Sequence, residues 1–423
     1  MGILIQGGRI VDAATDTDKK GDIYLEDGVI TEIGEKLKIK DKNDRVIDAK
    51  GCLVMPGLID LHVHFRDPGF TYKEDIDTGA QAALQGGFTS VVLMANTKPV
   101  VDNEETLDYV LEKGKNTPIH VYSCASVSKG LQGKELVDME LLYSKGAAGF
   151  TDDGIPLLDV DILEQAFMKA ASIGVPVSLH EENPALISNN GVNSDIAQKK
   201  FGIGGSPREA EIDLIARDLD IALKTGVILD VQHISTKEGV ELVRQARQKS
   251  TKIHAEATPH HFSLTQEAVV EHGTLAKMNP PLRLEEDRQA IIAGIQDGTI
   301  DIIATDHAPH SVEEKSKPLT EAPSGIIGLE TALSLGITNL VDTGKVSMMQ
   351  LLACMSCNPA KMYGLNAGNL AIDSTADVVI FDPKAQWTVD KFASKSSNSP
   401  FVGNKLTGVI KYTIVNGNVY PVR

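Results

Sequence analysis

The chain has 423 residues, 42% of them hydrophobic, which is enough for one large domain with a buried core and a smaller one beside it. Its formal net charge of −17 argues against nucleic acid or an anionic membrane surface as a partner. No apolar segment approaches the length that crosses a bilayer, and the N-terminal sequence lacks the regions of a signal peptide. We therefore expect a cytoplasmic protein.

Both ends of the chain predict β-structure. Residues 2–35 consist of short β-type runs separated by Gly, Asp and Asn turns, and residues 376–390 and 408–423 have the same character. Neither end is long enough to form a stable core alone. We therefore expect one small β-sandwich domain built from both termini, residues 1–55 plus 366–423.

The middle of the chain alternates between apolar strand-like runs and helical patterns. One helix is predicted to begin with a capping box at Ser206-Pro-Arg-Glu209. Near-continuous apolar strands that alternate with helices indicate a parallel sheet covered on both faces. Eight such units predict an α/β fold, a (β/α)8 TIM-like barrel over residues 56–365, with a doubly wound open sheet as the alternative. The eight predicted strands lie in residues 58–65, 90–97, 119–126, 147–153, 175–180, 227–233, 252–261 and 300–307.

Polar side chains stand at the carboxyl ends of five predicted strands, on the barrel face where active sites form. Such a histidine is usually a satisfied hydrogen-bonding residue, but its recurrence on several strands favours a metal site. Imidazoles and carboxylates together suit zinc or a similar divalent ion, and six ligands exceed the three of a single catalytic zinc. The sequence thus predicts two ions that share a bridging carboxylate. The residues are His62 and His64, Asp152-Asp153, His180, His233 and Asp306.

The order of these motifs resembles the amidohydrolase superfamily and, within it, the bacterial dihydroorotases. The resemblance covers the whole chain and rests on D-x-H-x-H at residues 60–64 and on HVHFRDPG, ANTKPVVDN, GFTDDG, HISTKEG, ATPHH, KMNPPLR, ATDHAPH and APSGIIGLET. It implies the reversible cyclisation of N-carbamoyl-L-aspartate to L-dihydroorotate in pyrimidine biosynthesis, with metal-activated water. It also implies zinc as cofactor, a small acidic substrate as a binding partner, and a homodimer.

The resemblance assigns a role to each matching residue. His62 and His64 would bind one ion, His180 and His233 the second, and Asp153 would bridge them. Asp306 would bind the first ion and carry the proton. Arg66 and Asn96 would hold the α-carboxylate of the substrate. The full set of expected substrate contacts is His64, Arg66, Asn96, Asn279, His310, Ser324 and Gly325.

Two positions depart from the pattern of relatives. Hydantoinases bridge their metals with a carboxylated lysine at strand four, but here the strand reads AAGFTDD and Lys145 precedes it. Asp153 must then bridge, so two zinc ions are expected, with one ion as the alternative. Ser324 replaces a frequent aromatic residue, so we expect any contact there from its backbone or from Gly325. The charged, Pro-rich segment 307–325 is expected to be a mobile lid.

Two other functions remain open at this point. A hydantoinase or allantoinase would keep the enzyme class, but the missing lysine together with Arg66 and Asn96 argues against both. A catalytically dead barrel that acts as a scaffold would have lost metal ligands, whereas all six positions are filled here.

Overall fold

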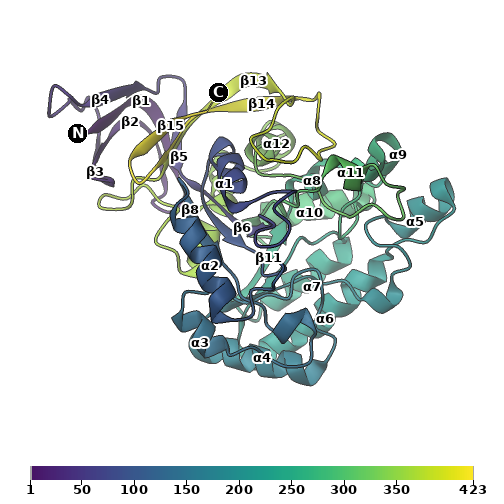
Figure 1. Cartoon of the computed structure of the whole chain (residues 1–423). Helices are drawn as coiled ribbons and strands as arrows, with labels where there is room; N and C mark the ends of the chain where they lie inside the picture. Colours follow the sequence, from purple (N-terminus) through teal and green to yellow (C-terminus); the bar gives the residue numbers. More distant parts are fainter. Residues whose placement is uncertain (1, 423) are drawn as a thin grey trace.

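The computed structural model describes residues 2–422. Strands from both ends of the chain pair in one eight-stranded sheet, which Figure 1 shows as purple strands beside yellow ones. The order is β15-β14-β13-β5-β1-β2-β3, and β4 pairs with β1. The central strand β5 joins the two ends, because it is parallel to β1 and antiparallel to β13. The bounds are β1 Ile3–Asp12, β2 Thr17–Glu26, β3 Val29–Gly34, β4 Arg45–Asp48, β5 Leu53–Pro56, β13 Val378–Thr388, β14 Lys405–Val415 and β15 Asn418–Pro421.

Two tight turns set the register of this sheet. Asp27-Gly28 joins β2 to β3, and Asn416-Gly417 joins β14 to β15; all four residues have positive φ. Two-residue loops of this conformation match the right-handed twist of hairpin strands, and Asn-Gly and Asp-Gly are their preferred sequences. An aliphatic cluster rich in isoleucine, from both ends of the chain, is buried against the sheet. The short runs and turns read from the sequence thus form a sheet domain from both termini, as predicted.

The middle of the chain forms the barrel. Strands β6, β7 and β8 form one parallel sheet, and β9 to β12 form another. Two isolated bridging positions close them into a cylinder: Phe150 pairs with Ala125 and Val177, and Val63 pairs with His307. The predicted (β/α)8 barrel is confirmed. The strands are β6 Leu58–Val63, β7 Phe88–Leu93, β8 His120–Ser123, β9 Pro176–Leu179, β10 Ile228–Val231, β11 Ile253–Ala257 and β12 Ile302–Ile303.

The fourth barrel strand is the least regular. Residues 147–153 were expected to form a strand; backbone hydrogen bonds join residues 148–151 to both neighbouring strands, but the bridges of this segment are isolated ones at Phe150. At the end of this segment, the carboxylate of Asp152 accepts hydrogen bonds from the N–H groups of Val127 and Ser128. This side-chain anchor draws the chain toward the loop after β8, so the strand ends where the site begins.

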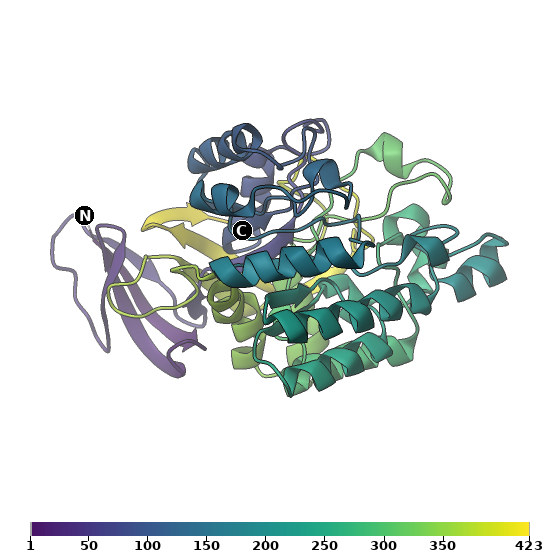
Figure 2. The same cartoon turned by 90° about the horizontal axis from the view of Figure 1, so that it is seen from below.

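Helices cover the outside of the cylinder, and Figure 2 shows several of them side by side. The capping box expected at Ser206 is wrong: α6 begins at Arg208, and the Ser206 hydroxyl instead donates to Glu182 at 2.6 Å. Within residues 2–422, no helix has the length and apolar character needed to cross a membrane. The principal helices are α1 Ile76–Gln85, α2 Glu104–Lys115, α3 Met139–Ser144, α4 Val160–Ile173, α6 Arg208–Thr225, α7 Lys237–Arg247, α10 Glu285–Asp297, α12 Ala332–Gly336, α13 Met348–Met355 and α14 Cys357–Tyr363.

Candidate metal and active site

A cavity of about 380 Å³ opens at the carboxyl ends of the barrel strands. Apart from His62, every predicted metal ligand and every predicted substrate contact lines it. His62 does not line the cavity and is completely buried. The lining predicted from the sequence comprises His64, Arg66, Asn96, Asp153, His180, His233, Asn279, Asp306, His310, Ser324 and Gly325.

The candidate metal ligands form two groups that share Asp153. One group contains His62, His64 and Asp153, and the other contains Asp153, His180 and His233; the ligand atoms of each group lie within 4.8 Å of one another. Asp153 Oδ1 is 3.3 Å from His62 Nε2, and Asp153 Oδ2 is 3.5 Å from His64 Nε2. A carboxylate common to two imidazole groups is the arrangement expected of a bridging ligand.

Asp306 lies against the first group. Its Oδ1 is 3.1 Å from His64 Nε2 and 3.6 Å from His62 Nε2. In the second group, His180 Nδ1 is 3.0 Å from His233 Nε2. All six predicted ligands thus converge at one end of the cylinder, although they come from strand ends spread over more than 240 residues of sequence.

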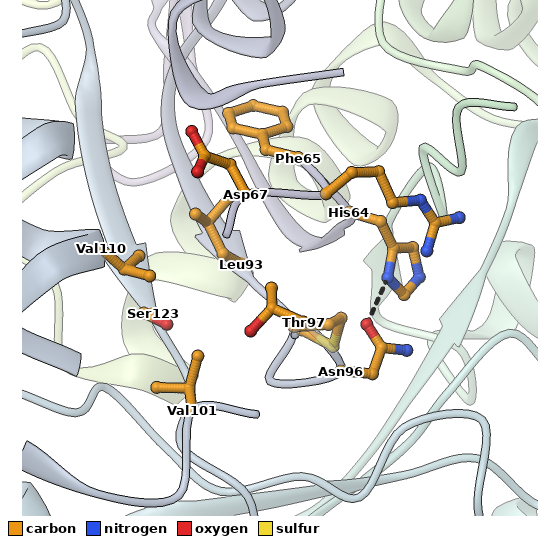
Figure 3. Close-up of a pocket in the computed structure, with 11 residues that line it drawn as sticks. His64, Phe65, Asp67, Leu93, Asn96, Thr97, Val101, Val110 and Ser123 are labelled. Atoms are coloured by element: carbon orange, nitrogen blue, oxygen red, sulfur yellow. Dashed lines mark hydrogen bonds between the residues drawn. The ribbon is translucent and has the colours of Figure 1, made fainter. Parts of the chain in front are cut away.

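The hydrogen bonds behind the first pair of histidines fix the orientation of their rings. Nδ1 of His62 lies 3.0 Å from Glu256 Oε2, and Nδ1 of His64 lies 3.0 Å from Asn96 Oδ1 (Figure 3). Both neighbours are oxygen atoms, so in a metal-binding form of these rings Nδ1 would carry the proton and Nε2 would offer its lone pair to the ion. Metal-binding histidines are commonly held in this way by a carboxylate or amide oxygen.

These residues fit a divalent cation. Nε2 of His62 is buried and has no hydrogen-bond partner within residues 2–422. Burial alone would lower the pKa of His62, but the carboxylates of Glu256 and Asp153 outweigh it and raise this pKa well above its usual value. The pKa of Asp153 is lowered although burial opposes this, because His62 and His64 lie beside it. The negative potential that would hold a proton on His62 would equally attract a metal ion.

His233 is electrostatically different from His62. Burial lowers its pKa well below the usual value, and the neighbouring His180 and His62 lower it further. The imidazole of His233 is therefore neutral, which is the form that binds metals. The pKa of His180 is raised, since the contact with Glu182 outweighs the effect of burial. Nε2 of His180 lies 3.3 Å from that carboxylate.

Three residues of the site have an unusual backbone conformation. Arg66, His233 and Asp306 have φ angles of 59°, 31° and 47°, in the left-handed region that non-glycine residues seldom adopt. Each lies two or three residues after the end of a barrel strand. Strained residues persist where the surrounding fold enforces them, and they gather at functional sites. Here the strain turns each side chain toward the cavity.

Arg66 has no anionic partner. Among residues 2–422, no carboxylate lies within 4.0 Å of its guanidinium; Nε donates to the carbonyl of Pro309 at 3.3 Å, and Nη2 lies 3.5 Å from His310 Nε2. Burial lowers its pKa, and the more distant Asp306 and Asp153 partly compensate. An arginine that lines a cavity without a carboxylate partner is suited to an anionic ligand, which it can bind through two parallel hydrogen bonds.

The lid segment is folded over this end of the cavity. Nε2 of His310 lies 2.8 Å from the carbonyl oxygen of Ser324, and the Gly325 N–H donates to the carbonyl of Lys277 at 2.8 Å. The backbone groups expected to contact a substrate are thus already bonded within the protein. The Ser324 hydroxyl, by contrast, is buried without a hydrogen-bond partner in the described part of the chain.

Several functional neighbours were missed by the sequence analysis. Lys277 and Asn190 also line the cavity. The Lys277 ammonium donates to Leu319 O at 2.8 Å and Ala322 O at 2.7 Å, so it binds the lid. Glu256 had a recognisable signal, because it is a carboxylate in the middle of a predicted barrel strand. Lys145, as expected, lies away from the site, where it pairs with Glu104 at 2.7 Å.

Comparison with known proteins agrees with this geometry. Residues 53–420 match the profile of the amidohydrolase family. The chain is 53% identical over 417 residues to a dihydroorotase of Clostridioides difficile (strain 630), and 48% identical over 419 residues to one of Clostridium acetobutylicum; each alignment covers 99% of both chains. An L-hydantoinase (dihydropyrimidinase) from Arthrobacter aurescens superposes with a TM-score of 0.87 at 28% identity, covering 99% of this chain and 95% of the other.

The barrel and the terminal sheet have the fold of the hydantoinase structure, and the chain belongs to the amidohydrolase family. Within that family, these curated relatives of about half identical sequence are named dihydroorotase.

Proposed function

We propose that the chain is a zinc-dependent dihydroorotase, which interconverts N-carbamoyl-L-aspartate and L-dihydroorotate with loss or uptake of water. The observation that carries this proposal is the guanidinium of Arg66, which has no carboxylate partner and lies in the same cavity as the two ligand groups. A cyclic amide with a carboxylate substituent would satisfy both features at once. The dihydroorotase relatives support this choice of substrate.

In this proposal, His62, His64, Asp153, His180, His233 and Asp306 would hold two zinc ions, with one ion as the alternative. Bound zinc would supply a hydroxide nucleophile at neutral pH and polarise the ring carbonyl. Asn279, whose amide nitrogen lies 3.2 Å from His180 Nε2, would contact the ring beside the second ligand group.

The remaining steps belong to the side chains. Arg66 and Asn96 would orient the ring through its carboxylate, and His310 would flank it. In the hydrolytic direction, Asp306 would accept the proton of the attacking water and transfer it to the ring nitrogen as the C–N bond breaks. In the direction of ring closure the same carboxylate returns the proton, and water leaves.

The test is hydrolysis of dihydroorotate before and after removal of metal with a chelator, followed by addition of zinc. Hydantoin and allantoin are assayed beside it, because the hydantoinase likeness makes them the relevant competitors. We expect dihydroorotate to be preferred, activity to disappear on chelation, and zinc to restore it. Preference for hydantoin or allantoin, or full activity in metal-free protein, would overturn the proposal.

A further inference from the structure

We propose that Asn398, a residue of the terminal sheet domain, positions Arg66 for the carboxylate of the substrate. This inference rests on the proposed function. Asn398 lies in the connection between β13 and β14, in a short segment, residues 393–398, that we call the strap. The strap reaches from the sheet to the mouth of the barrel, where Asn398 is only 3% exposed.

The side chain of Asn398 holds the peptide groups on both sides of Pro309. Its Oδ1 accepts from the His310 N–H at 3.1 Å, and its Nδ2 donates to the carbonyl of Ala308, also at 3.1 Å. The same Nδ2 donates to Gly325 O at 3.1 Å. The surrounding backbone offers one donor, the His310 N–H, and two acceptors, the carbonyls of Ala308 and Gly325. The Asn398 amide fits them in only one orientation, because a 180° flip would place its oxygen against the two carbonyl oxygens.

The segment that Asn398 holds is the one that contacts Arg66. Between Ala308 and His310 lies Pro309, whose carbonyl accepts the hydrogen bond from Arg66 Nε. With Nε bonded there, a carboxylate would bind the two terminal nitrogens of the guanidinium, of which Nη2 also lies 3.5 Å from His310 Nε2. A shift of the Pro309 carbonyl would rotate the planar guanidinium, and a bidentate contact depends on that plane.

The strap also contacts the loop that carries Arg66. The Lys395 N–H donates to Glu74 Oε1 at 3.0 Å, and the Ser396 hydroxyl donates to Lys73 O at 2.7 Å. Ser394 bonds through its hydroxyl to the same Glu74 carboxylate. The strap therefore connects the loop after β6, which carries Arg66, with the segment after β12, which the Arg66 Nε contacts.

The test compares Asn398→Ala with Ser397→Ala, which alters the adjacent, exposed strap residue. We expect Asn398→Ala to raise KM for dihydroorotate about tenfold, the effect of losing on the order of one buried hydrogen-bonded contact. The kcat and the metal content should stay within twofold of wild type, and Ser397→Ala should match wild type throughout. Asn398→Asp, which keeps the shape but places an oxygen against Ala308 O and Gly325 O, should raise KM at least as much and replaces the alanine variant should that fail to fold.

A second readout separates positioning from a purely structural role. In an Arg66→Ala background, Asn398→Ala should raise KM by less than twofold, because the group through which it acts is gone. An unchanged KM in the single variants, an equal increase in the Arg66→Ala background, or a parallel loss of kcat and metal would overturn the inference. A wild-type protein that does not hydrolyse dihydroorotate would instead overturn the proposed function on which it rests.

Discussion

Asp152 and Asp153 are consecutive residues whose carboxylates serve different parts of the structure. Asp152 accepts from Val127 N at 2.7 Å and Ser128 N at 3.1 Å, away from the cavity. Asp153 faces the cavity and accepts from the Asn96 amide at 2.9 Å. A sequence pattern of two acids therefore contains one anchor of the loop after β8 and one candidate metal ligand.

Replacement of aspartate by asparagine at these two positions should affect two different properties, metal content at Asp153 and stability at Asp152. We expect Asp153→Asn to lower the metal bound per chain, because a neutral amide replaces the carboxylate shared by both ligand groups. Asp152→Asn should keep the metal but lose about 1–3 kcal/mol of stability, since a buried acceptor is replaced by a donor. Metal analysis and thermal unfolding of both variants check this. Equal metal content in the two variants would show that Asp153 is not a metal ligand.

Asp306→Asn should lower kcat about 100- to 10,000-fold, the usual contribution of a positioned proton carrier. The side chain keeps its size beside His64, but an amide does not accept the proton of the attacking water. Carbamoyl aspartate should still bind, because Arg66 and Asn96 are unchanged. Steady-state kinetics with a direct binding measurement provide the test, and a near-normal rate would exclude Asp306 as the proton carrier.

Arg66→Lys should raise KM for dihydroorotate by about one to two orders of magnitude while changing kcat little. A lysine keeps the positive charge but loses the planar pair of donors that grips a carboxylate. It also loses Nε, which bonds to Pro309 O. An unchanged KM would place the substrate carboxylate elsewhere.

Lys315 gives a pH-dependent prediction for the lid. Its ammonium donates to Pro323 O and Gly325 O, each at 2.9 Å, and burial, reinforced by Lys277, lowers its pKa to about 7. An unfolded chain keeps this lysine protonated to a much higher pH. Above pH 7 the unfolded state therefore binds more protons than the folded state, and this group makes the protein more stable as pH rises.

The measurement is the difference in thermal unfolding between wild type and Lys315→Met at pH 6.5 and pH 9. The advantage of wild type should increase with pH. Lys317→Met, which alters an exposed lysine two residues away, should show no such trend. A difference that is independent of pH would mean that Lys315 keeps an ordinary pKa in the folded protein.

The sequence predicted the parts of the site that follow barrel strands. His62, His64, His180, His233 and Asp306 each interrupt an apolar run at its end, and the closure of the barrel then dictates that they meet. The fourth strand and the start of α6 were less predictable. The Asp152 carboxylate accepts from Val127 and Ser128, and the Ser206 hydroxyl donates to Glu182; local patterns do not contain such partners.

The role proposed for Asn398 could not be predicted from the sequence. The residue lies in the polar stretch SKSSNSPF, which has the composition of an ordinary surface loop. Its hydrogen bonds to the barrel side reach residues at least 71 positions away. Residues that act from another domain through backbone groups leave no periodicity or spacing by which to find them.

The pairing of β5 with β13 has a consequence for synthesis on the ribosome. Strands β1 to β5 leave the exit tunnel more than 300 residues before their partner, so the edge of β5 that receives β13 stays open during most of translation. Unpaired edges of this kind readily recruit other strands. Nascent chains that stall before residue 378 would therefore expose this unpaired strand edge and tend to aggregate. We expect chaperone binding to protect this protein most during that interval.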